Sequence, residues 1–568
     1  MENQEPDILP KKRKNRWLVW LIASPFLLFA LLCVLLYLPP VQNFVVDKVA
    51  TVASDATGLN ISVGRITLSF PLDLVVKDVQ AVNPEKGDTL LSLKRLEVSV
   101  QMLPLLKKEI EIDGIGIEDA DVHTGDFIDG MGIDGHLGEL FLESHGVVFD
   151  PEKAVVNEFS IKNTDLEICL TDTTETPDTT TTDTLYWKID LRKIALENVS
   201  VGLKMPHDSL DMRVALASST LKNGYIDLHE SSYSVRSFDI QEGVFVMDST
   251  LNLQSIDLQV DSVYYCDRDI RATVSRFDLA EKNTGLEVLS TYAKVVADKH
   301  QIRIPALDMR TVSSTLKADA SLDWDLLEMK PSSAVSATLK ADIGKRDVAL
   351  MTGTLLDSTF IKHYPDAPLQ LRADMEGDLN RLQLHTLSAT LLDALDIRSH
   401  GELKYLTDSL RRGGELTLSA IAEDLSFLPA MTGGVAIPTG TSLQGKALVE
   451  GPQMVADMTL ALPDTLTQQT DTVMTLGARY HLSNEAYQVQ LDIDELDVHQ
   501  FLPQDSIYGI TAWLKAEGEG FDFFSPRTRL EAQGHVGKVH YGSYQLNGYD
   551  LSAGLENHQL KASLLADN

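Results

Sequence analysis

The chain has 568 residues and a formal net charge of −34, with 49 Lys and Arg against 83 Asp and Glu. This balance argues against a nucleic-acid-binding protein, because duplex binding depends on cationic side chains that neutralise phosphates. Hydrophobic residues make up 44% of the chain, which excludes intrinsic disorder, and three cysteines are too few for a disulfide scaffold.

The N-terminal region joins a basic tail, residues 1–16, to a long uncharged segment. No charged side chain occurs from Trp17 to Val46, and Pro39 and Pro40 interrupt this run. As a helix, residues 17–38 would be about 33 Å long, enough to cross the hydrocarbon core of a bilayer. We therefore predict a retained transmembrane helix over residues 17–38, because no Ala-x-Ala cleavage site follows it. The basic tail places the N-terminus in the cytoplasm and the rest of the chain on the far side.

Residues 39–58 carry apolar side chains at helical spacing, and Gly58 is a typical helix stop. The apolar positions are Val41, Phe44, Val45, Val49, Val52, Ala53 and Ala56. Such a short amphipathic helix could cap the open end of the first sheet or lie on the outer leaflet. Lys48 is its only basic residue and is opposed by Asp47 and Asp55, which favours the cap over binding to anionic lipid.

From Asn60 onward the hydrophobic period changes from helical to two, which is typical of strands with one apolar face. We expect a first β region over residues 59–170 and a repetitive β region over residues 185–568, both largely antiparallel. At about 12 residues per strand with its turn, some 500 residues would form roughly 40 strands. The candidate lining residues of an apolar groove are Ile66, Leu68, Phe70, Leu72, Val335, Leu339, Tyr487, Val489 and Leu491.

A short repeat recurs in the first β region: an apolar residue, Lys or Glu, Asp or Asn, then a small or β-branched residue. Its copies are Val76–Val79, Ile117–Ala120, Ile161–Thr164 and Leu196–Val199, with spacings of 41, 44 and 35 residues. Fixed periods of this kind indicate stacked structural units. Between the last two copies, residues 171–184 are rich in Thr and Asp and carry no apolar side chain besides one proline, so we predict a disordered loop.

The search for catalytic chemistry gives no candidate. His229 and Glu230 begin like a zinc-protease helix, but Tyr233 stands where the second His is required. We predict no enzyme activity, no cofactor and no metal site. Cys169 and Cys266 are the only cysteines beyond the predicted membrane segment, and their spacing does not decide whether they are bonded.

In the order of its motifs, the chain resembles the TamB and AsmA-like proteins of bacterial envelopes. The resemblance rests on the N-terminal anchor, the helix ending in Thr57–Asn60, the strand from Val63 to Pro71, the Val76–Val79 segment and the glycine-punctuated strands to Asn568. It implies a long twisted β-sheet curled into an elongated apolar groove. A protein of this kind would be anchored in the bacterial inner membrane, with its bulk in the periplasm, and would carry phospholipid towards the outer membrane.

The same resemblance implies an alternative role in outer-membrane protein assembly or secretion with a partner β-barrel. TamB-type proteins usually end in a distinctive β-domain, whereas this sequence ends in what reads as a strand. It therefore resembles the N-terminal part of a TamB-type protein or a shorter AsmA-like branch.

Physical reasoning leads to similar alternatives without the resemblance. A sheet with one apolar face and few helices must curl on itself, pair with a second sheet, or leave a groove for acyl chains. A packed β-solenoid, a scaffold that pairs client strands at its edges, and an anchored enzyme remain as other interpretations.

Overall fold

The computed structural model describes most of the chain beyond the predicted membrane segment. It covers Ser24 and residues 27–28, 30–31, 34–35, 38–69, 73–100, 112–128, 130–149, 152–171, 186–352, 358–429, 434–463, 470–522, 525 and 527–566. Within these ranges, no helix is long and apolar enough to cross a bilayer. Most of residues 17–38 and of the Thr-rich segment 171–184 lies outside them, so the membrane helix and the disordered loop stay predictions.

The prediction of a mainly β protein is confirmed. Strands account for 69% of the residues, and they form one mixed sheet of 27 strands that does not close. The expectation of roughly 40 strands was wrong because individual strands are long; β5 (Met131–Phe149) and β6 (Glu152–Leu170) have 19 residues each. One described pair, β6 with β7 (Lys188–Met205), is parallel rather than antiparallel. The chain divides into two compact units, Met1–Gln254 (unit 1) and Ser255–Asn568 (unit 2).

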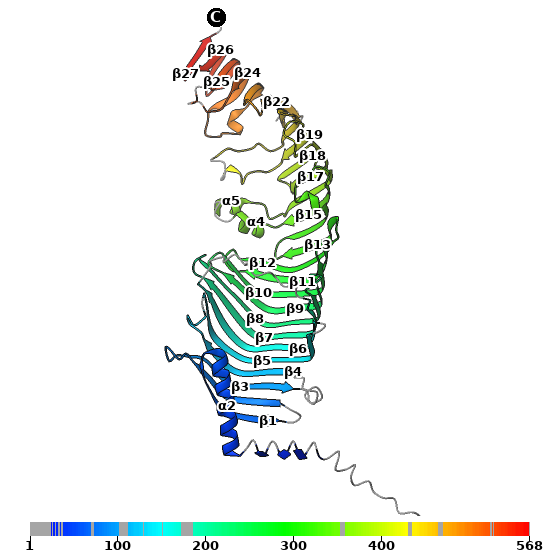
Figure 1. The fold of residues 1–568 in the computed structure, drawn as a ribbon. Coiled ribbons are helices and arrows are strands. Elements are labelled where there is room, and N and C mark those ends of the chain that lie inside the picture. Colours follow the sequence, from blue (N-terminus) through cyan, green and yellow to red (C-terminus); the bar gives the residue numbers. More distant parts are fainter. Residues whose placement is uncertain are drawn as a thin grey trace, which may run out of the picture. The chain divides into compact units, whose positions relative to one another are not determined.

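In the part of unit 1 that the structure describes from Leu38 onward, one helix is followed by a series of strands that pair in chain order (Figure 1). Besides β5 to β7, its elements are α2 (Pro39–Thr57), β1 (Asn60–Ser69), β2 (Asp73–Val82), β3 (Thr89–Val100), β4 (Ile112–His123), β8 (Leu210–Asp227) and β9 (Ser232–Met247). The helix α2 confirms the predicted element at residues 39–58, and Gly58 ends it in the left-handed conformation with φ of 72°.

The helix α2 packs against β1, the first strand of the sheet. The amide of Gln42 donates to the carbonyl of Ile66 at 3.4 Å, and the backbone N–H of Ile61 donates to the hydroxyl of Ser54 at 2.9 Å. Among the described strand pairs, β1 joins only β2. A helix over an end strand covers backbone groups that would otherwise invite another strand, so α2 acts as the predicted cap.

The short repeat forms a line of residues across unit 1 that are left out of the strand pairing on both partners, without a shift in register; we call it the bulge line. Its third residues, Asp78, Asp119, Asn163 and Asn198, all have φ between 49° and 53° and are exposed. Asp and Asn tolerate this left-handed conformation better than most residues, which explains their recurrence at the third position. A bulge bends its strand, and the strands of unit 1 curve in Figure 1.

Apolar residues on both sides of the bulge line face inward and are among the most buried in the unit. They include Ile66, Val76, Leu93, Ala120 and Val199. The two apolar residues that flank a bulge are three positions apart rather than two, as with Val76 and Val79, so the apolar face continues through the bend.

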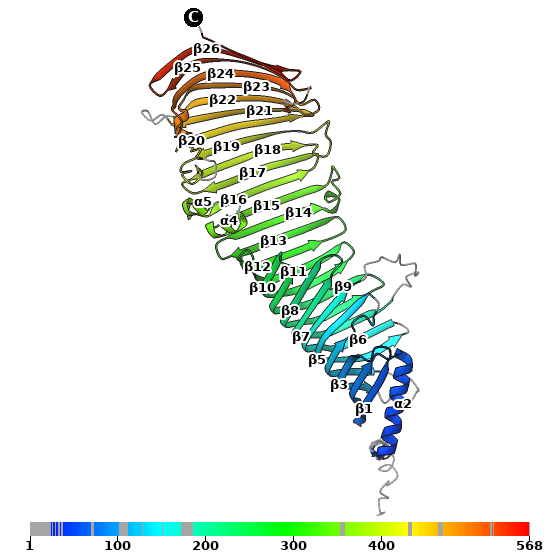
Figure 2. The same cartoon turned by 90° about the vertical axis from the view of Figure 1, so that its left-hand side faces the viewer.

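Unit 2 continues the pattern with shorter strands that again pair in chain order (Figure 2). The boundary falls within β10 (Leu251–Cys266). The following strands are β11 (Asp269–Glu281), β12 (Leu286–Ala297), β13 (Gln301–Thr311), β14 (Thr315–Asp323), β15 (Ala334–Ile343), β16 (Leu369–Asp378), β17 (Arg381–Leu391), β18 (Leu395–Lys404), β19 (Gly413–Ala422), β20 (Thr441–Glu450), β21 (Gln453–Pro463), β22 (Thr470–His481), β23 (Ala486–Leu496), β24 (Ile507–Glu519), β25 (Arg529–Tyr541), β26 (Tyr544–Glu556) and β27 (Gln559–Ala566).

A small core forms where helices meet the strand ends of unit 2. The described helices of unit 2 are η1 (Trp324–Leu326), α4 (Lys345–Thr352), α5 (Ser358–His363) and η3 (Val498–Gln500), and this core involves α4 and α5. Tyr364 and Phe427 meet edge to face at 5.4 Å between ring centroids, in a buried cluster with Leu391, Ala394 and Ala422. Ile361 of α5 and Val348 of α4 pack against this cluster, so the two helices cover the ends of β16 to β19.

Candidate functional site

The five candidate lining residues of unit 2 lie on one face of its sheet. In β15, Val335 and Leu339 are half-buried while the intervening Ser336, Thr338 and Lys340 are exposed. In β23, Tyr487, Val489 and Leu491 are half-buried and alternate with exposed polar residues in the same way. The sequence-based assignment of faces is therefore confirmed for both strands.

Strand register connects these residues into columns that run across the sheet. The Leu339 column contains Ala318, Leu339, Ala373, Leu387, Ser399, Leu418, Gly445, Met458, Leu476, Leu491, Leu514, Gly534, Leu551 and Leu564. It joins β14 to β27 without a charged side chain. At about 4.8 Å per strand, its length is on the order of 60 Å.

Three further columns complete what we call the apolar face of unit 2. The Val335 column contains Leu322, Val335, Gly377, Leu382, Leu403, Gly414, Val449, Met454, Tyr480, Tyr487, Gly518, Leu530, Leu555 and Leu560. The Ala337 column contains Ala320, Ala337, Met375, Leu384, Gly401, Leu416, Ala447, Ala456, Ala478, Val489, Ala516, Ala532, Ala553 and Ala562. The fourth contains Leu316, Ala341, Leu371, Ala389, Ile397, Ala420, Leu443, Leu460, Met474, Ile493, Ala512, Val536, Tyr549 and Ala566.

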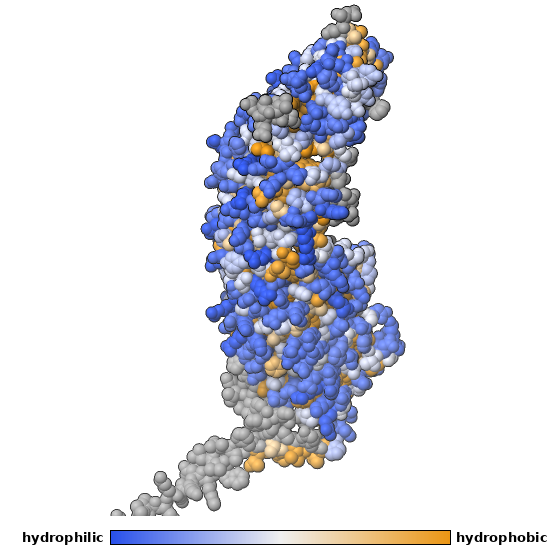
Figure 3. Space-filling model, turned by 180° about the vertical axis from the view of Figure 1, so that it is seen from behind, coloured by the Kyte–Doolittle hydropathy of each residue, from blue (hydrophilic) through white to orange (hydrophobic). Residues whose placement is uncertain are grey.

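The opposite face of the same strands is polar. Lys340 pairs in register with Lys317 and Arg372, and Gln490 pairs with Gly477 and Lys515. Viewed from behind in Figure 3, the surface of the molecule is mostly hydrophilic, with hydrophobic residues in smaller patches. The sheet of unit 2 is thus strongly amphipathic: its polar face can be hydrated, and its apolar face can contact apolar molecules.

The apolar face is hollowed around Leu339. A cavity of about 450 Å³ is lined there by aliphatic side chains of β15 to β19, among them Leu371, Leu387, Ile397 and Leu418. Leu387 is 50% exposed, so the cavity communicates with its surroundings. Its size and lining match those of pockets that bind apolar ligands.

Towards β27 the relief of the face changes. The Ala337 column consists of Ala, apart from Val489, in β20 to β27, while the neighbouring columns carry Met458, Leu476, Leu491 and Leu514 or their counterparts. Because Ala is shorter than Leu or Met, this row forms a low strip between two rows that are taller except at Gly445, Gly518 and Gly534. The strip crosses the strands in the same direction as the columns.

Aromatic residues mark one margin of the apolar face. Tyr480 and Tyr487 lie opposite each other in register, and Phe521 stacks on Tyr487 with 5.0 Å between ring centroids. Burial raises the pKa of Tyr487, so its phenol stays neutral and the margin adds no charge to the face.

In unit 1, Ile66 lies on the inward apolar face and is 1% exposed. Leu68 pairs with Leu74 in register, but its side chain and all of Phe70 and Leu72 lie outside the described residues. Ile66 is therefore a packed residue of the bend rather than an accessible lining residue. Among the candidate residues whose side chains are described, the accessible ones lie in unit 2.

The buried carboxylate of Asp347 attaches α4 to the turn between β13 and β14. Asp347 accepts hydrogen bonds from the hydroxyls of Thr311 and Ser314, the latter at 2.5 Å. Burial would raise the pKa of Asp347, but these hydroxyl bonds outweigh it and leave the pKa below its usual range. The carboxylate therefore stays ionised and fixes the helix at the margin of the apolar face.

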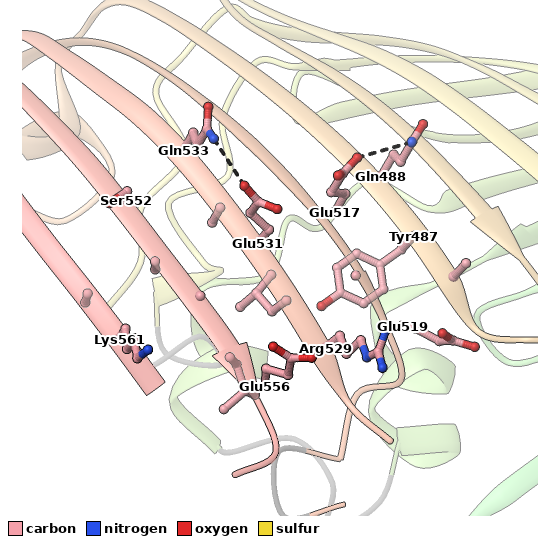
Figure 4. Close-up of a pocket in the computed structure, with 18 of the residues that line it drawn as sticks. Tyr487, Gln488, Glu517, Glu519, Arg529, Glu531, Gln533, Ser552, Glu556 and Lys561 are labelled. Carbon is pink, nitrogen blue, oxygen red and sulfur yellow. Dashed lines mark hydrogen bonds between the residues drawn. The ribbon is translucent and has the colours of Figure 1, made fainter. Parts of the chain in front are cut away.

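A second type of cavity, about 1050 Å³, is polar and is lined mainly by β22 to β27 (Figure 4). Glu517 and Glu531 face each other across β24 and β25, and each accepts a hydrogen bond from an amide, of Gln488 and Gln533 respectively. The described residues contain no group of three or more His, Cys, Asp or Glu side chains placed to hold a metal ion. Its lining also includes Tyr480, Tyr487, Leu530 and Leu555 of the Val335 column, so polar groups border the apolar face at this margin.

Comparison with known proteins does not assign the chain: no family model matches it, and neither does any curated protein. The resemblance to TamB and AsmA-like proteins therefore stays a prediction. Cys169 and Cys266 are not joined to each other by a disulfide.

Sequence reasoning missed most residues of the cavity, although the signal was present. Leu369, Leu371 and Ala373 alternate with polar residues as clearly as the candidates in β15 do. What the alternation does not reveal is which residues share a column, because that depends on turn lengths and bulges.

Proposed function

We propose that the protein is a membrane-anchored carrier that moves phospholipid along the apolar face, with acyl chains on the sheet and headgroups in water. The resemblance suggests a setting between the bacterial inner and outer membranes, with the bulk of the chain in the periplasm. The observation that carries the proposal is the uncharged face of unit 2, continuous over 14 strands from β14 to β27.

Continuity matters more than apolarity alone. A lipid that moves from strand to strand needs a path on which no step desolvates a charge or leaves the acyl chain in water. The four columns supply such a path. Apart from Ser399, all their residues are Ala, Gly, Leu, Ile, Val, Met or Tyr. The cavity near Leu339 adds a place where an acyl chain is partly enclosed.

The amphipathic sheet also bears on the alternatives. In a packed sandwich or solenoid a second layer would cover the apolar face, but in the described residues the helices α4 and α5 cover only strand ends. The role in outer-membrane protein assembly with a partner β-barrel differs in its contacts, because it uses backbone edges rather than the apolar face.

Site-specific photocrosslinking in bacterial cells tests the proposal. A photoreactive residue at Leu339 or Leu491 should give adducts with phospholipid by mass spectrometry of the purified full chain. The matched controls are Lys340 and Asp492, which follow in sequence but face the opposite side. Protein adducts in place of lipid at Leu339 and Leu491 would favour the assembly scaffold, and absence of any intermolecular adduct would favour a packed face.

A further inference from the structure

We infer that the outer side of α2 lies in the headgroup layer of the membrane, so that this helix seats unit 1 on the lipid surface while capping β1. The inference rests on the membrane anchor of the proposed function but not on lipid carriage. It assigns a lipid surface as the partner of the apolar side chains that α2 leaves uncovered.

The helix has two apolar sides with different neighbours. Val45, Val46 and Ala53 are half-buried on the side that packs on β1. On the remaining surface, Phe44 is 70% exposed, Val52 is 56% exposed and Val49 is 38% exposed. At about 100° per residue these three span about 140° of the helix circumference, with the exposed Lys48 and Asp55 between Phe44 and Val52. A cap needs only the first side, and exposed large apolar residues gathered on one short element mark an interaction surface.

The position of α2 brings this surface to the membrane. The backbone N–H groups of Val41 and Gln42 both donate to the carbonyl of Leu38, at 3.0 and 2.9 Å, so α2 begins directly after the last residue of the predicted membrane segment. Phe44 follows Leu38 by six residues, or about 9 Å of helix. The headgroup layer is about 5–8 Å thick on each side of the hydrocarbon core, so Phe44 cannot lie far from it.

The uncharged run gives a second argument. It extends from Trp17 to Val46, whereas a span needs only about 20 residues. The surplus, residues 39–46, forms the first two turns of α2. Charged residues are disfavoured in a segment that contacts lipid, and the first charges, Asp47 and Lys48, appear only after these turns.

The charges of α2 indicate which lipid surface fits. Lys48 is its only basic residue, and Asp47 and Asp55 outnumber it. Attraction to anionic headgroups therefore contributes little, and the apolar side chains must supply the binding free energy. We accordingly expect α2 to seat on zwitterionic lipid and to respond weakly to salt.

Spin labels on the full chain, reconstituted in phosphatidylcholine vesicles, test the inference. The labels are attached at Phe44→Cys, Val52→Cys and the control Asn43→Cys, in a chain whose native cysteines are replaced by Ser. Asn43 is exposed and lies on the opposite side of the helix from Val52, nine residues away at about 100° per residue. We expect the ratio of collisions with oxygen to collisions with a water-soluble nickel chelate to be several-fold higher at Phe44 and Val52 than at Asn43.

Three outcomes would overturn the inference. Equal, water-like ratios at Val52 and Asn43 would mean that α2 stands away from the membrane. Immobilised labels with little access to either reagent would mean that a second protein surface, such as another copy of the chain, covers the site. A ratio at Val52 that rises only when anionic lipid is added would contradict seating on zwitterionic lipid. Lipid adducts at Leu339 report on carriage separately, so failure of one idea is distinguishable from failure of the other.

Discussion

Replacing Leu339 by Asp places a carboxylate in the cavity of the apolar face. In the protein without lipid the side chain is half-buried, so the lost transfer free energy is about 1 kcal/mol, roughly half of that for a fully buried Leu. With an acyl chain in the cavity, the unpaired polar group costs about 2 kcal/mol or more. Because 1.4 kcal/mol corresponds to a factor of ten, lipid affinity should fall about 30-fold while the fold persists.

The assay is transfer of a fluorescent phospholipid between vesicles by the full chain, with melting followed by circular dichroism. Ser336→Asp serves as the control, since Ser336 is an exposed residue of the same strand on the polar face and the substitution adds the same charge. Contact with lipid would raise the pKa of the introduced carboxyl, so transfer by Leu339→Asp should recover as the pH falls and the group becomes neutral. Transfer at the wild-type rate by a folded Leu339→Asp protein would refute the reasoning.

Further substitutions test the bend, the helix anchor and the strip of small side chains. A Cβ added at Gly138 would lie 2.7 Å from the carbonyl oxygen of Asn163. Gly138→Ala should therefore lower the free energy of unfolding, measured by thermal denaturation, by about 1–3 kcal/mol. Gly116→Ala should be nearly neutral, since the nearest atom there is 3.6 Å away. Because the folded pKa of Asp347 is depressed, its stabilisation is present above the unfolded value of about 3.9 and is lost as pH falls through the folded pKa. The protection factors of the α4 amides, which correct for the intrinsic exchange rate at each pH, should therefore fall in acid in the wild type and should be low at all pH values in Asp347→Ala. Ala516→Trp should fill the low strip and slow lipid transfer without lowering the melting temperature, and unchanged transfer would mean that this strip is not on the path.

Local alternation allowed the faces of single strands to be predicted, and β15 shows why. Val335 and Leu339 are separated by polar residues at every odd step, and side chains two apart must point the same way in a strand. The helix at residues 39–58 was predictable for a similar reason, since its apolar spacing is helical and Gly58 can adopt the left-handed stop. These features depend on neighbours within a few residues.

Features that depend on distant contacts could not be predicted in this way. The repeat that contains Asn163 marks a left-handed residue inside one long strand, and too many strands were expected because about 12 residues per strand had been assumed. The parallel pairing of β6 with β7 places Asn198 beside Asn163, and their side-chain amides are joined at 3.1 Å. Nothing in either segment alone distinguishes this pairing from a hairpin.

The compensation of bulges in unit 2 argues that the apolar face is maintained as a whole. A shift of one residue in register turns every later side chain to the opposite face, so an uncompensated bulge would end the columns. Leu384 and Leu387 are three positions apart opposite Gly401 and Ser399, and Ile493 and Leu496 are three apart opposite Ala512 and Ile510. At both of these irregularities an apolar residue stands at the shifted position, whereas at the shift between Leu460 and Ala461 the residue opposite Leu462 is Asp471.

Packing of single strand pairs would be satisfied by apolar contacts near each turn. Such contacts do not require the Leu339 column to stay uncharged beyond each bulge. The column nevertheless stays uncharged as far as Leu564, whose side chain is 63% exposed. An exposed apolar row has a free-energy cost in water unless something apolar lies on it. A continuous face of this length is therefore more simply explained by a mobile apolar ligand that must pass every strand than by local stability.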